Sequence, residues 1–474
     1  MGEKRSTKQI CMIVCASLTL QFSLSILVNS RVFPLFNAYL PHAKDFSTLV
    51  GALFLFAIAA IAMRRPFPFV TLKMTLTFAG AAAAGVAITV AGTAVESVPL
   101  TLVGTTLLSL GGRTIVPLYI CFTLVRLTRA QTYLVLLIAL VAQYPVAYAV
   151  NLLPGFAVYI YIAVAPIAAV LLSWQGGASK MLSGRDSRRL RDMAVANPHS
   201  FIPLSHIVFL TIAVFNLATG CALTYLSDGG VPQSAAFSIL PLAILLVAAI
   251  AGRQLNGDAL VRLSYLLILG GFLVVPLADL PGNAAEILSV SSPWLFAAGS
   301  SCFDLVFYLL LSEIGRRNCF GAVPLFALGY GASRIGFEAG ALLGHVMNIS
   351  AEGAVVIAAA LAFLFATFEV SILNNINFQA LIEDVRPVPE VQAPKSEPME
   401  RELSELCDRA VERFHLTPRE TEITRLLAQG RSVAVIQEEL VVSKNTVKTH
   451  VKNIYLKLDV HSQQELIDLI RNLH

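Results

Sequence analysis

Residues 443–458 read SKNTVKTHVKNIYLKL and predict an α-helix with two different faces. Four apolar residues follow the i, i+4, i+7, i+11 spacing that places them on one side of a helix. These residues are Val447, Val451, Ile454 and Leu458. A continuous apolar face needs other helices to pack against, so this stretch is expected to belong to a small helical domain.

The other face of this helix carries a row of cations. Lys444, Lys448 and Lys452 are spaced by four residues, Thr449 stands beside them, and residues 443–458 contain no acidic residue. Such a row, held on a compact helical scaffold, suits insertion into the major groove of DNA. A merely solvated helix face is the weaker interpretation because the flanking residues form a specific motif.

The sequence on both sides predicts the helices that hold this one. Residues 400–414 form a short amphipathic helix, and four helices follow it. The first opens with Thr417-Pro418-Arg419-Glu420, a capping box with proline at the first helical position, and ends before Gly430. The second spans 432–440, the third is the two-faced helix, and the last opens with a second capping box at 462–465.

From Leu416 to Leu458 the chain strongly resembles the LuxR-type (GerE-like) helix-turn-helix. The family pattern L-T-x-R-E, a helix ended by glycine, and S-x-x-T-V-K-x-H-x-x-N-I-x-x-K-L can all be read here. The chain departs from the family at Gln437, Asp459 and Gln463, where Ala, Gly and Arg are usual. The resemblance implies a transcription regulator that binds double-stranded DNA as a homodimer.

The resemblance also implies three groups of site residues. Base edges would be met by Lys448, Thr449 and Lys452. Phosphates would be held by the helix N-terminus with Lys444, Asn445 and Thr446. The last helix would pair two subunits through Leu466, Leu469 and Ile470.

The charge of this domain is balanced. Residues 401–474 contain eleven Lys and Arg and eleven Asp and Glu. Non-specific affinity from phosphate neutralisation should therefore be modest. Dimerisation or confinement near the membrane would raise occupancy by increasing the effective concentration.

The residues before this domain have the composition of a membrane protein. Over the whole chain 56% of residues are hydrophobic and only 14% are charged, whereas soluble proteins carry about 25% charged residues. Twelve runs reach the roughly 20 apolar residues that a membrane-spanning helix needs. They lie near 10–29, 47–63, 70–94, 98–124, 131–151, 155–174, 204–227, 232–251, 260–278, 294–312, 321–344 and 353–374. The fourth run is expected to be broken by Gly111-Gly112-Arg113 and by Pro117.

The loops between these runs alternate in charge. Seventeen Lys and Arg residues lie at the N-terminus and in alternate loops, and the opposite loops hold only Arg31 and Lys44. Since cytoplasmic loops retain Lys and Arg, both termini are expected in the cytoplasm of a bacterium, with the spans in its inner membrane. We do not expect the basic start of the chain to be a cleaved signal peptide, because no small-residue cleavage site follows and more spans come after it.

Six spans at 10–174, a basic loop at 175–203 and six spans at 204–374 resemble the layout of the major facilitator superfamily. The signature loop of that family is absent, since residues 63–68 read MRRPFP. The resemblance implies that spans one, four, seven and ten line a central cavity. We therefore expect an all-α protein: a twelve-helix membrane bundle at 1–375, a Pro-rich linker at 376–399 and a DNA-binding domain at 400–474.

Ionisable side chains at bilayer depth are costly and are functional candidates by default. Arg113 and Asp304 lie in spans four and ten and would face the cavity from pseudo-symmetric positions, where Gln21 and Asn216 could add hydrogen bonds. Backbone carbonyls or buried water could equally satisfy Arg113 and Asp304.

Two more ionisable residues stand in span eleven. Arg334 and Glu338 are four apart on one helical face. An internal ion pair is the favoured interpretation of these two residues, and a contribution to ligand binding is the alternative. The first six spans contain no acidic residue at mid-membrane depth, which weakens a transport function, because proton-coupled pumps use buried carboxylates.

The linker is extended and of limited reach. Four prolines between Val385 and Pro398 exclude a continuous helix, and at about 3.1 Å per residue the spacer reaches roughly 40 Å. The DNA-binding domain is thus expected to stay near the membrane.

The chain has none of the common catalytic motifs, and its seven cysteines form no pair or metal-like cluster. We therefore expect no enzyme, no cofactor and no metal. The leading hypothesis is a one-component regulator whose spans sense a small molecule or a membrane signal. The alternatives are a facilitator-type transporter with a fused regulatory domain, and spans that act as a passive anchor.

Overall fold

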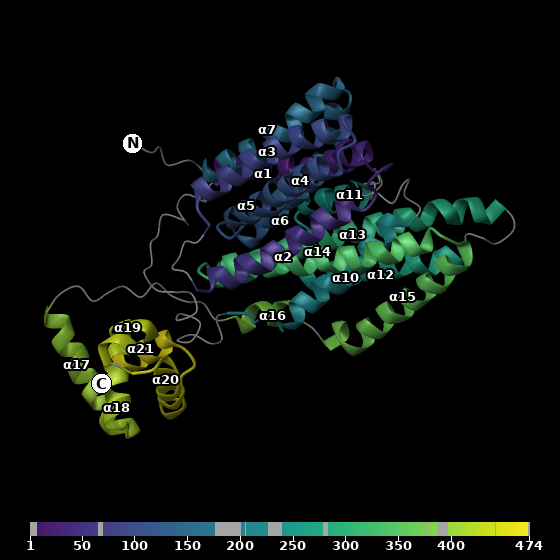
Figure 1. Cartoon of the computed structure of the whole chain (residues 1–474). Helices are drawn as coiled ribbons and strands as arrows, with labels where there is room; N and C mark the ends of the chain where they lie inside the picture. The colour runs from purple at the N-terminus through teal and green to yellow at the C-terminus, as the bar shows by residue number, and fades with distance from the viewer. Residues whose placement is uncertain are drawn as a thin grey trace.

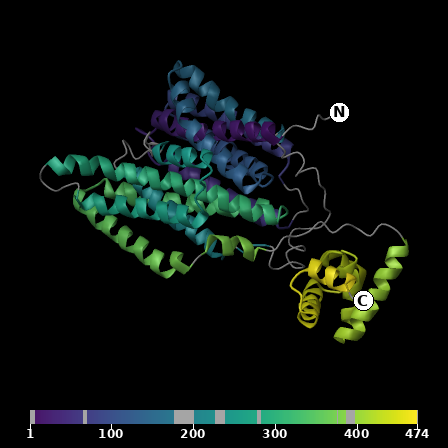
Figure 2. The same cartoon turned by 180° about the vertical axis from the view of Figure 1, so that it is seen from behind.

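The protein is described here as a computed structural model, whose described residues are 7–64, 70–175, 201–203, 205–225, 239–277, 283–375, 377–385, 397–440 and 442–472. All regular secondary structure in these ranges is helical, which confirms the all-α prediction. A long bundle and a smaller group of helices lie apart in both views (Figures 1 and 2). Most of the 175–203 loop, and residues 376 and 386–396 of the Pro-rich linker, fall outside the described residues.

The first half of the bundle holds the first six expected spans. Its helices are α1 (Thr7–Leu27), α2 (Ala43–Ala62), α3 (Leu72–Ala94), α4 (Val98–Leu108), α5 (Val116–Leu124), α6 (Arg129–Asn151) and α7 (Gly155–Ser173). The chain continues from α1 through a π-turn, η1 (Val28–Val32), and a short 3₁₀ helix, η2 (Phe33–Leu35). Lys44 and Asp45 fall in the first turn of α2 rather than in the preceding loop.

The second half of the bundle is formed by the helices that follow the 175–203 loop. Its helices are α10 (Ile207–Thr224), α11 (Ile239–Ile250), α12 (Gly257–Val274), α13 (Asn283–Arg317), α14 (Ala322–Met347) and α15 (Ala351–Ser371). The shorter elements η8 (Val275–Leu277), η9 (Leu373–Asn375) and α16 (Phe378–Asp384) complete it. Counted over the described residues, ten helices are long and apolar enough to cross a membrane. The shorter α11 and the glycine-rich α14 stand at the expected eighth and eleventh spans.

The expected break in the fourth span is wrong. The chain stays helical from Val98 to Leu124, because a π-helical turn, η3 (Ser109–Ile115), joins α4 to α5. Gly111 lies so close to the backbone of Phe78 that a side chain would not fit there. A π-turn absorbs an extra residue without ending the helix, and Pro117 falls in the first turn of α5, where its missing N–H is not needed.

Glycines bring α10 and α14 into close contact. A Cβ at Gly336, Gly340 or Gly344 would meet the backbone of α10, and one at Gly220 would meet the backbone of α14. Small residues at four-residue spacing allow this approach in membrane bundles, where van der Waals packing replaces the hydrophobic effect. The two halves meet where α2 packs on α14 and where α6 packs on α11 and α13.

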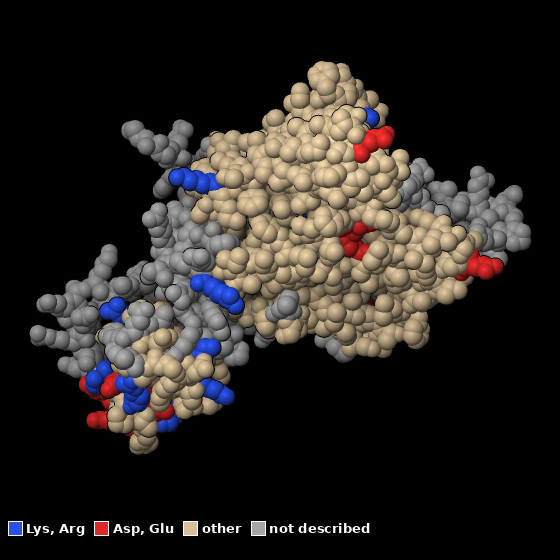
Figure 3. All heavy atoms as spheres, viewed as in Figure 1, with Lys and Arg blue, Asp and Glu red and all other residues tan. Residues whose placement is uncertain are grey.

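The surface of the bundle fits a lipid environment. Its face in Figure 3 is almost free of charged side chains. Large apolar residues such as Ile160, Val247 and Phe363 are more than half exposed there or elsewhere on the bundle. Apolar patches of this extent on a soluble protein would drive aggregation. Together with the long apolar helices, they indicate a polytopic membrane protein.

The C-terminal helices have a hydrophobic core of their own. They are α17 (Glu397–Phe414), α18 (Pro418–Ala428), α19 (Val433–Leu440), α20 (Lys444–Leu458) and α21 (Gln463–Arg471). Leu427, Val447, Ile454 and Leu466 are fully buried in this core. Cys407 is buried with them, and burial raises the pKa of its thiol to about 11, consistent with a packing residue.

Candidate functional site

The start of α18 fixes the position of α20. Thr417 and Glu420 form the expected capping box, in which the Glu420 carboxylate accepts the Thr417 N–H at 2.9 Å. The same oxygen of Glu420 accepts a hydrogen bond of 2.7 Å from Lys457 Nζ, near the end of α20. Lys457 also donates to the His415 carbonyl at 3.2 Å. This lysine of α20 therefore has a structural role, since it joins the end of α20 to the start of α18.

The pKa of Glu420 reflects this arrangement. Burial alone would raise the pKa of the carboxyl, but hydrogen bonds from Lys457 and Thr417 outweigh burial and hold the pKa below its usual value. The charged carboxylate is thus the form that stabilises the contact between α18 and α20.

The two faces of α20 are as the sequence predicts. Val447, Val451, Ile454 and Leu458 are at most 2% exposed. On the other side Asn445, Thr446, Thr449 and Lys452 are exposed, and Lys448 is half-buried. The Ser443 side chain accepts the Thr446 N–H at 3.2 Å and caps the helix. Thr449 Oγ1 donates to the Asn445 carbonyl at 3.0 Å, so in this structure its hydroxyl bonds its own helix. Of Lys444 only the backbone lies within the described part.

Polar contacts brace the helices around α20. Arg419 donates to the Leu440 carbonyl at the end of α19, at 3.0 Å. Gln463, which stands where the family usually has Arg, is buried and donates to the carbonyls of Leu427 and Arg431 at 2.9 and 3.2 Å. The departure at Gln463 therefore satisfies the end of α18. Glu465 accepts the His461 N–H at 2.7 Å.

The residues expected to pair two subunits need a correction. Leu466 and Ile470 are fully buried within one chain, because they face the core formed with α18 and α17. Only Leu469 is partly exposed, beside the exposed Asp468 and Arg471. A partner can therefore reach α21 through Leu469 and its polar neighbours, and the dimer stays a prediction.

The membrane domain contains a polar cavity between its halves. The cavity encloses about 250 Å³ and is lined by residues of α1, α2, η3, α10, α13 and α14. All six residues expected to bind a ligand line it. They are Gln21, Arg113, Asn216, Asp304, Arg334 and Glu338. Positions far apart in the sequence thus converge on one space, although their ligand role stays a prediction.

Arg334 does not form the expected ion pair with Glu338. Its guanidinium crosses to the other half of the bundle, donating to Thr114 Oγ1 at 2.7 Å and to the Arg113 carbonyl. The expectation fails because the π-turn presents a hydroxyl and a carbonyl directly to Arg334. The two carboxylate oxygens of Glu338 are buried and have no hydrogen-bond partner among the described residues.

Other polar atoms around the cavity are also unsatisfied. Gln21 donates to the Gly112 carbonyl at 2.9 Å, but its Oε1 is buried without a partner within the described residues. The same holds for Arg113 Nη1, while the Arg113 guanidinium lies 5.5 Å over the Phe33 ring. Asn216 accepts a bond of 2.9 Å from Ser333. Unsatisfied buried donors and acceptors are costly, and a polar ligand or water in the cavity would satisfy them.

Sequence reasoning missed several residues of the cavity, among them Lys44, Tyr308 and Tyr330. Lys44 lines it with its side chain only 5% exposed, although a basic residue near a span end resembles a loop residue. Tyr330 donates to the Tyr308 hydroxyl at 3.1 Å, and both rings line the same wall. Their spacing on α13 and α14 gives no signal beyond ordinary aromatic packing, so only the fold reveals them.

The short helix α16, which follows the last span, contacts both halves of the bundle. The Phe378 N–H is capped by Asp258 of α12 at 2.8 Å, and Gln379 accepts from Arg129 of α6 at 3.2 Å. Arg317 of α13 donates to the Glu383 carbonyl at 3.3 Å. A second cavity, of about 440 Å³, lies between these elements. The helix that leads from the membrane domain toward the C-terminal domain therefore contacts both halves.

The C-terminal domain matches known regulators. Residues 415–470 match the family described as bacterial regulatory proteins, luxR family. The uncharacterized response regulatory protein YgeK of Escherichia coli K12 is 45% identical over 65 residues, 13% of this chain and 44% of YgeK. Spore germination protein GerE of Bacillus subtilis 168 is 39% identical over 57 residues, 12% of this chain and 77% of GerE. The chain thus spans less than half of YgeK but most of GerE.

The membrane domain matches solved transporters in fold. A bacterial homologue of the iron transporter ferroportin, outward-facing with soaked iron, superposes with a TM-score of 0.53 at 14% identity, covering 78% of this chain and all of that one. A double Trp mutant of XylE gives a TM-score of 0.50 at 14% identity, covering 80% and 99%. The human organic anion transporter MFSD10 gives 0.50 at 12%, covering 77% and 99%. The bundle therefore has the major facilitator fold predicted from its loops.

Proposed function

Because the chain belongs, through its C-terminal domain, to the luxR family of bacterial regulatory proteins, we propose that it is a membrane-integral one-component transcription regulator. In this proposal the facilitator-like domain senses a small molecule and controls sequence-specific DNA binding by α20. The observation that carries it is a polar cavity, shared by both halves of the bundle, on the same chain as a DNA-binding domain. Sensing and binding require no chemical step, so we propose no enzymatic activity.

The residues of the cavity suggest the kind of ligand. Lys44, Arg113 and Arg334 supply three cationic groups, and Asp304 and Glu338 supply two carboxylates. Aromatic side chains line the same space. A small polar molecule with an anionic group, and with a donor for Glu338, would pair with the unsatisfied atoms. Such a ligand contacts both halves, so it can favour one of their arrangements over another.

The signal would pass through α16. This helix is held by Arg129 of the first half and by Asp258 and Arg317 of the second. Rocking of the halves would then change its position and, through the linker, the spacing or pairing of two DNA-binding domains. In this proposal, which the loop charges support, this end lies in the cytoplasm of a bacterium and the spans lie in its inner membrane. We propose a homodimer on a pseudo-palindromic site.

A reporter screen for small molecules tests this proposal. The intact chain is compared with residues 396–474 alone, each with a reporter behind the operator. The expected result is a compound that changes the output of the intact chain and leaves the fragment unaffected. A response that persists without the spans, or that persists when they are exchanged for an unrelated anchor, would refute membrane sensing.

A transporter with a fused regulatory domain is the second candidate. The cavity between the halves and Asp304 within it favour this candidate, since transporters carry substrates through such a cavity. It requires uptake or efflux by the protein in vesicles, lost when Asp304 or Arg113 is changed. Vesicles that bind the inducing compound but do not accumulate it would favour the sensor.

A further inference from the structure

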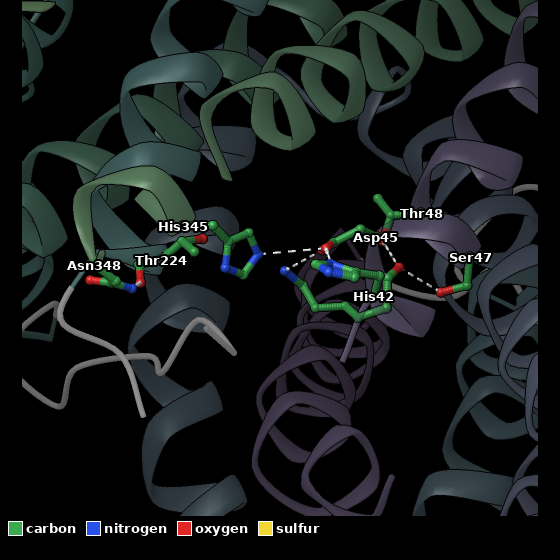
Figure 4. Close-up of polar contacts among 8 residues, drawn as sticks. His42, Asp45, Ser47, Thr48, Thr224, His345 and Asn348 are labelled. Carbon is green, nitrogen blue, oxygen red and sulfur yellow. Dashed lines mark hydrogen bonds and ion pairs between the residues drawn. The ribbon is translucent and has the colours of Figure 1, made fainter. Parts of the chain in front are cut away.

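Three side chains with metal-ligating atoms meet at the end of the bundle opposite α16 (Figure 4). Asp45 Oδ2 lies 3.5 Å from His42 Nδ1 and 3.5 Å from His345 Nε2. His42 and Asp45 begin α2 in the first half of the bundle, whereas His345 lies in the last turn of α14 in the second half. All three ligand atoms lie within 4.8 Å of one another.

These separations suit a transition metal ion. Zinc binds histidine nitrogen and carboxylate oxygen at about 2.0–2.2 Å in tetrahedral geometry, which places neighbouring ligand atoms about 3.3–3.5 Å apart. The two distances from Asp45 are already 3.5 Å. An ion between the three atoms would therefore need only small side-chain movements and would keep a fourth position for water.

The ligand residue of the second half, His345, lies at a helix end that is hydrogen-bonded to the neighbouring helix. His345 Nε2 is buried and has no hydrogen-bond partner among the described residues, although it faces Asp45. The end of α14 is tied to α10 by a bond of 3.0 Å from the Asn348 side chain to the Thr224 carbonyl. An unsatisfied ring nitrogen aimed at a carboxylate is the arrangement that a metal ion completes.

The ligand residues of the first half, His42 and Asp45, lie at the start of α2, where side-chain hydrogen bonds stabilise the first turn. Ser47 Oγ and Thr48 Oγ1 both donate to the Lys44 carbonyl, at 2.8 and 3.0 Å. The His42 side chain is 75% exposed, so an ion can enter from solvent. Lys44 Nζ lies 3.5 Å from Asp45 Oδ1, whereas both imidazoles pair with Oδ2. The lysine therefore lowers the affinity for a cation but leaves Oδ2 accessible.

We propose that His42, Asp45 and His345 bind a divalent transition metal ion of the zinc class, and that the ion clamps the two halves of the bundle together at this end. Imidazole nitrogen with one carboxylate is a donor set that suits zinc and copper. The sequence predicted no metal site because the ligands come from helices far apart along the chain. On the proposed topology, this end faces away from the cytoplasm.

Lys44 would couple the ion site to the polar cavity, because it contacts both. Lys44 contacts Asp45 and also lines the cavity with Arg113 and Glu338. An ion that binds Asp45 repels Lys44, and so alters the charge that a ligand meets. This regulatory consequence rests on the proposed sensing function, whereas binding of the ion does not.

Calorimetry with zinc chloride on the full-length protein tests the site. The protein carries a tag without histidine and sits in lipid nanodiscs at pH 7.5. One ion per chain is expected to bind, and His42→Ala, Asp45→Asn and His345→Ala are each expected to lower the affinity by at least about 10-fold, because even outer-shell changes cost about 10–100-fold. His461→Ala, which removes an exposed histidine of the C-terminal domain, is the matched control and should bind as the wild type does.

Two further measurements keep the test independent of folding. Each ligand variant must keep the wild-type elution volume and melting temperature without zinc. Zinc should raise the melting temperature of the wild type and of His461→Ala, but not that of the three ligand variants. Lys44→Met should increase the affinity, because a repelling charge is removed. Absence of binding by the wild type at tens of micromolar zinc, or binding by all three ligand variants with the wild-type affinity, overturns the proposal. None of these readouts uses DNA, so a failed regulator proposal would leave them unchanged.

Discussion

Arg334 of α14 donates a hydrogen bond of 2.7 Å to the hydroxyl of Thr114, in the π-turn of the opposite half of the bundle. The bond crosses the interface between the six-span halves, and Thr114 is 1% exposed. It therefore exists only while the halves stay together at this depth. We expect it to stabilise the arrangement seen here over one in which the halves separate.

Thr114→Val should increase the population of separated states. Hydrogen bonds to charged groups contribute about 1.5–3 kcal/mol, so this population should rise roughly tenfold or more. Cys121 reports on it, because its sulfur lies 3.4 Å from Tyr330 Oη across the same interface and is buried. The labelling rate of the Cys121 peptide with N-ethylmaleimide should rise by a similar factor.

Thr77→Val is the matched control for this substitution. Thr77 is exposed and bonds only within α3, to the Lys73 carbonyl at 3.0 Å. Its removal should leave Cys121 labelling at the wild-type rate. Equal labelling of Thr114→Val and the wild type would show that the bond does not hold the halves together.

The base-contact assignment makes a prediction for α20. Lys448→Ala should abolish specific operator binding. Lys452→Ala should weaken it by the about 1–3 kcal/mol that a lost base contact costs. Binding is measured by fluorescence anisotropy at two salt concentrations. Arg409→Ala, exposed on α17, should bind as the wild type does. Wild-type operator affinity in Lys448→Ala would refute the assignment.

The contact between Lys457 and Glu420 predicts a pH dependence of stability. The folded state lowers the pKa of Glu420, so the carboxylate stabilises the domain fully above the ordinary carboxyl range. That stability is lost as the pH falls from about 4.3, the unfolded pKa of Glu, toward the lower folded value. Urea unfolding of residues 397–474 between pH 3 and 7 should show this loss.

Lys457→Met should remove part of this dependence. The ion pair is partly exposed on the lysine side, so about 1 kcal/mol of stability should be lost at pH 7, and the decline toward acid should become shallower. Lys452→Met is the control, because Lys452 is exposed on the opposite side of α20. An unchanged acid limb in Lys457→Met would show that other carboxyls govern it.

Much of this structure could be predicted because the signals are local. The capping box at Thr417, the glycine after α18 and the apolar spacing of α20 each depend on residues a few positions apart. The six ligand candidates were found by a rule that needs no contacts, namely that ionisable and polar groups are rare at bilayer depth. The resemblance to the facilitator fold predicts that Gln21, Arg113, Asn216 and Asp304 converge on one cavity, but it does not predict that Arg334 and Glu338 of span eleven join them.

What could not be predicted depends on pairs from different helices. A sequence places Glu338 four residues from Arg334, but only the fold shows Thr114 closer to the guanidinium. Leu466 and Ile470 resemble an exposed pairing stripe until α17 and α18 are seen to cover them. His345 has no partner in its own segment, so its approach to Asp45 is visible only when α2 and α14 pack together.

The close packing of α10 and α14 predicts that Gly340 tolerates no side chain. A Cβ there would meet the carbonyl oxygen of Leu217, so Gly340→Ala should force the helices apart and destabilise the bundle by about 1–3 kcal/mol. Gly80→Ala is the control, because nothing lies within 4 Å of a Cβ at that position. Melting temperatures in nanodiscs should fall for Gly340→Ala alone, and equal values for both variants would contradict the packing argument.

The cap on α16 predicts a variant that binds DNA but no longer responds. Asp258 accepts the Phe378 N–H at 2.8 Å and so ties the start of α16 to α12. Asp258→Ala removes this cap, at a cost of about 1 kcal/mol to the helix start, and leaves α16 held to the second half of the bundle by Arg317 at its other end. The reporter response to an inducing compound should fall several-fold, while purified protein keeps its operator affinity. Glu352→Ala, in the exposed first turn of α15, should respond as the wild type does. If Asp258→Ala responds fully, α16 does not carry the signal, and the linker must receive it by another contact, such as that of Arg317 with the Val385 carbonyl.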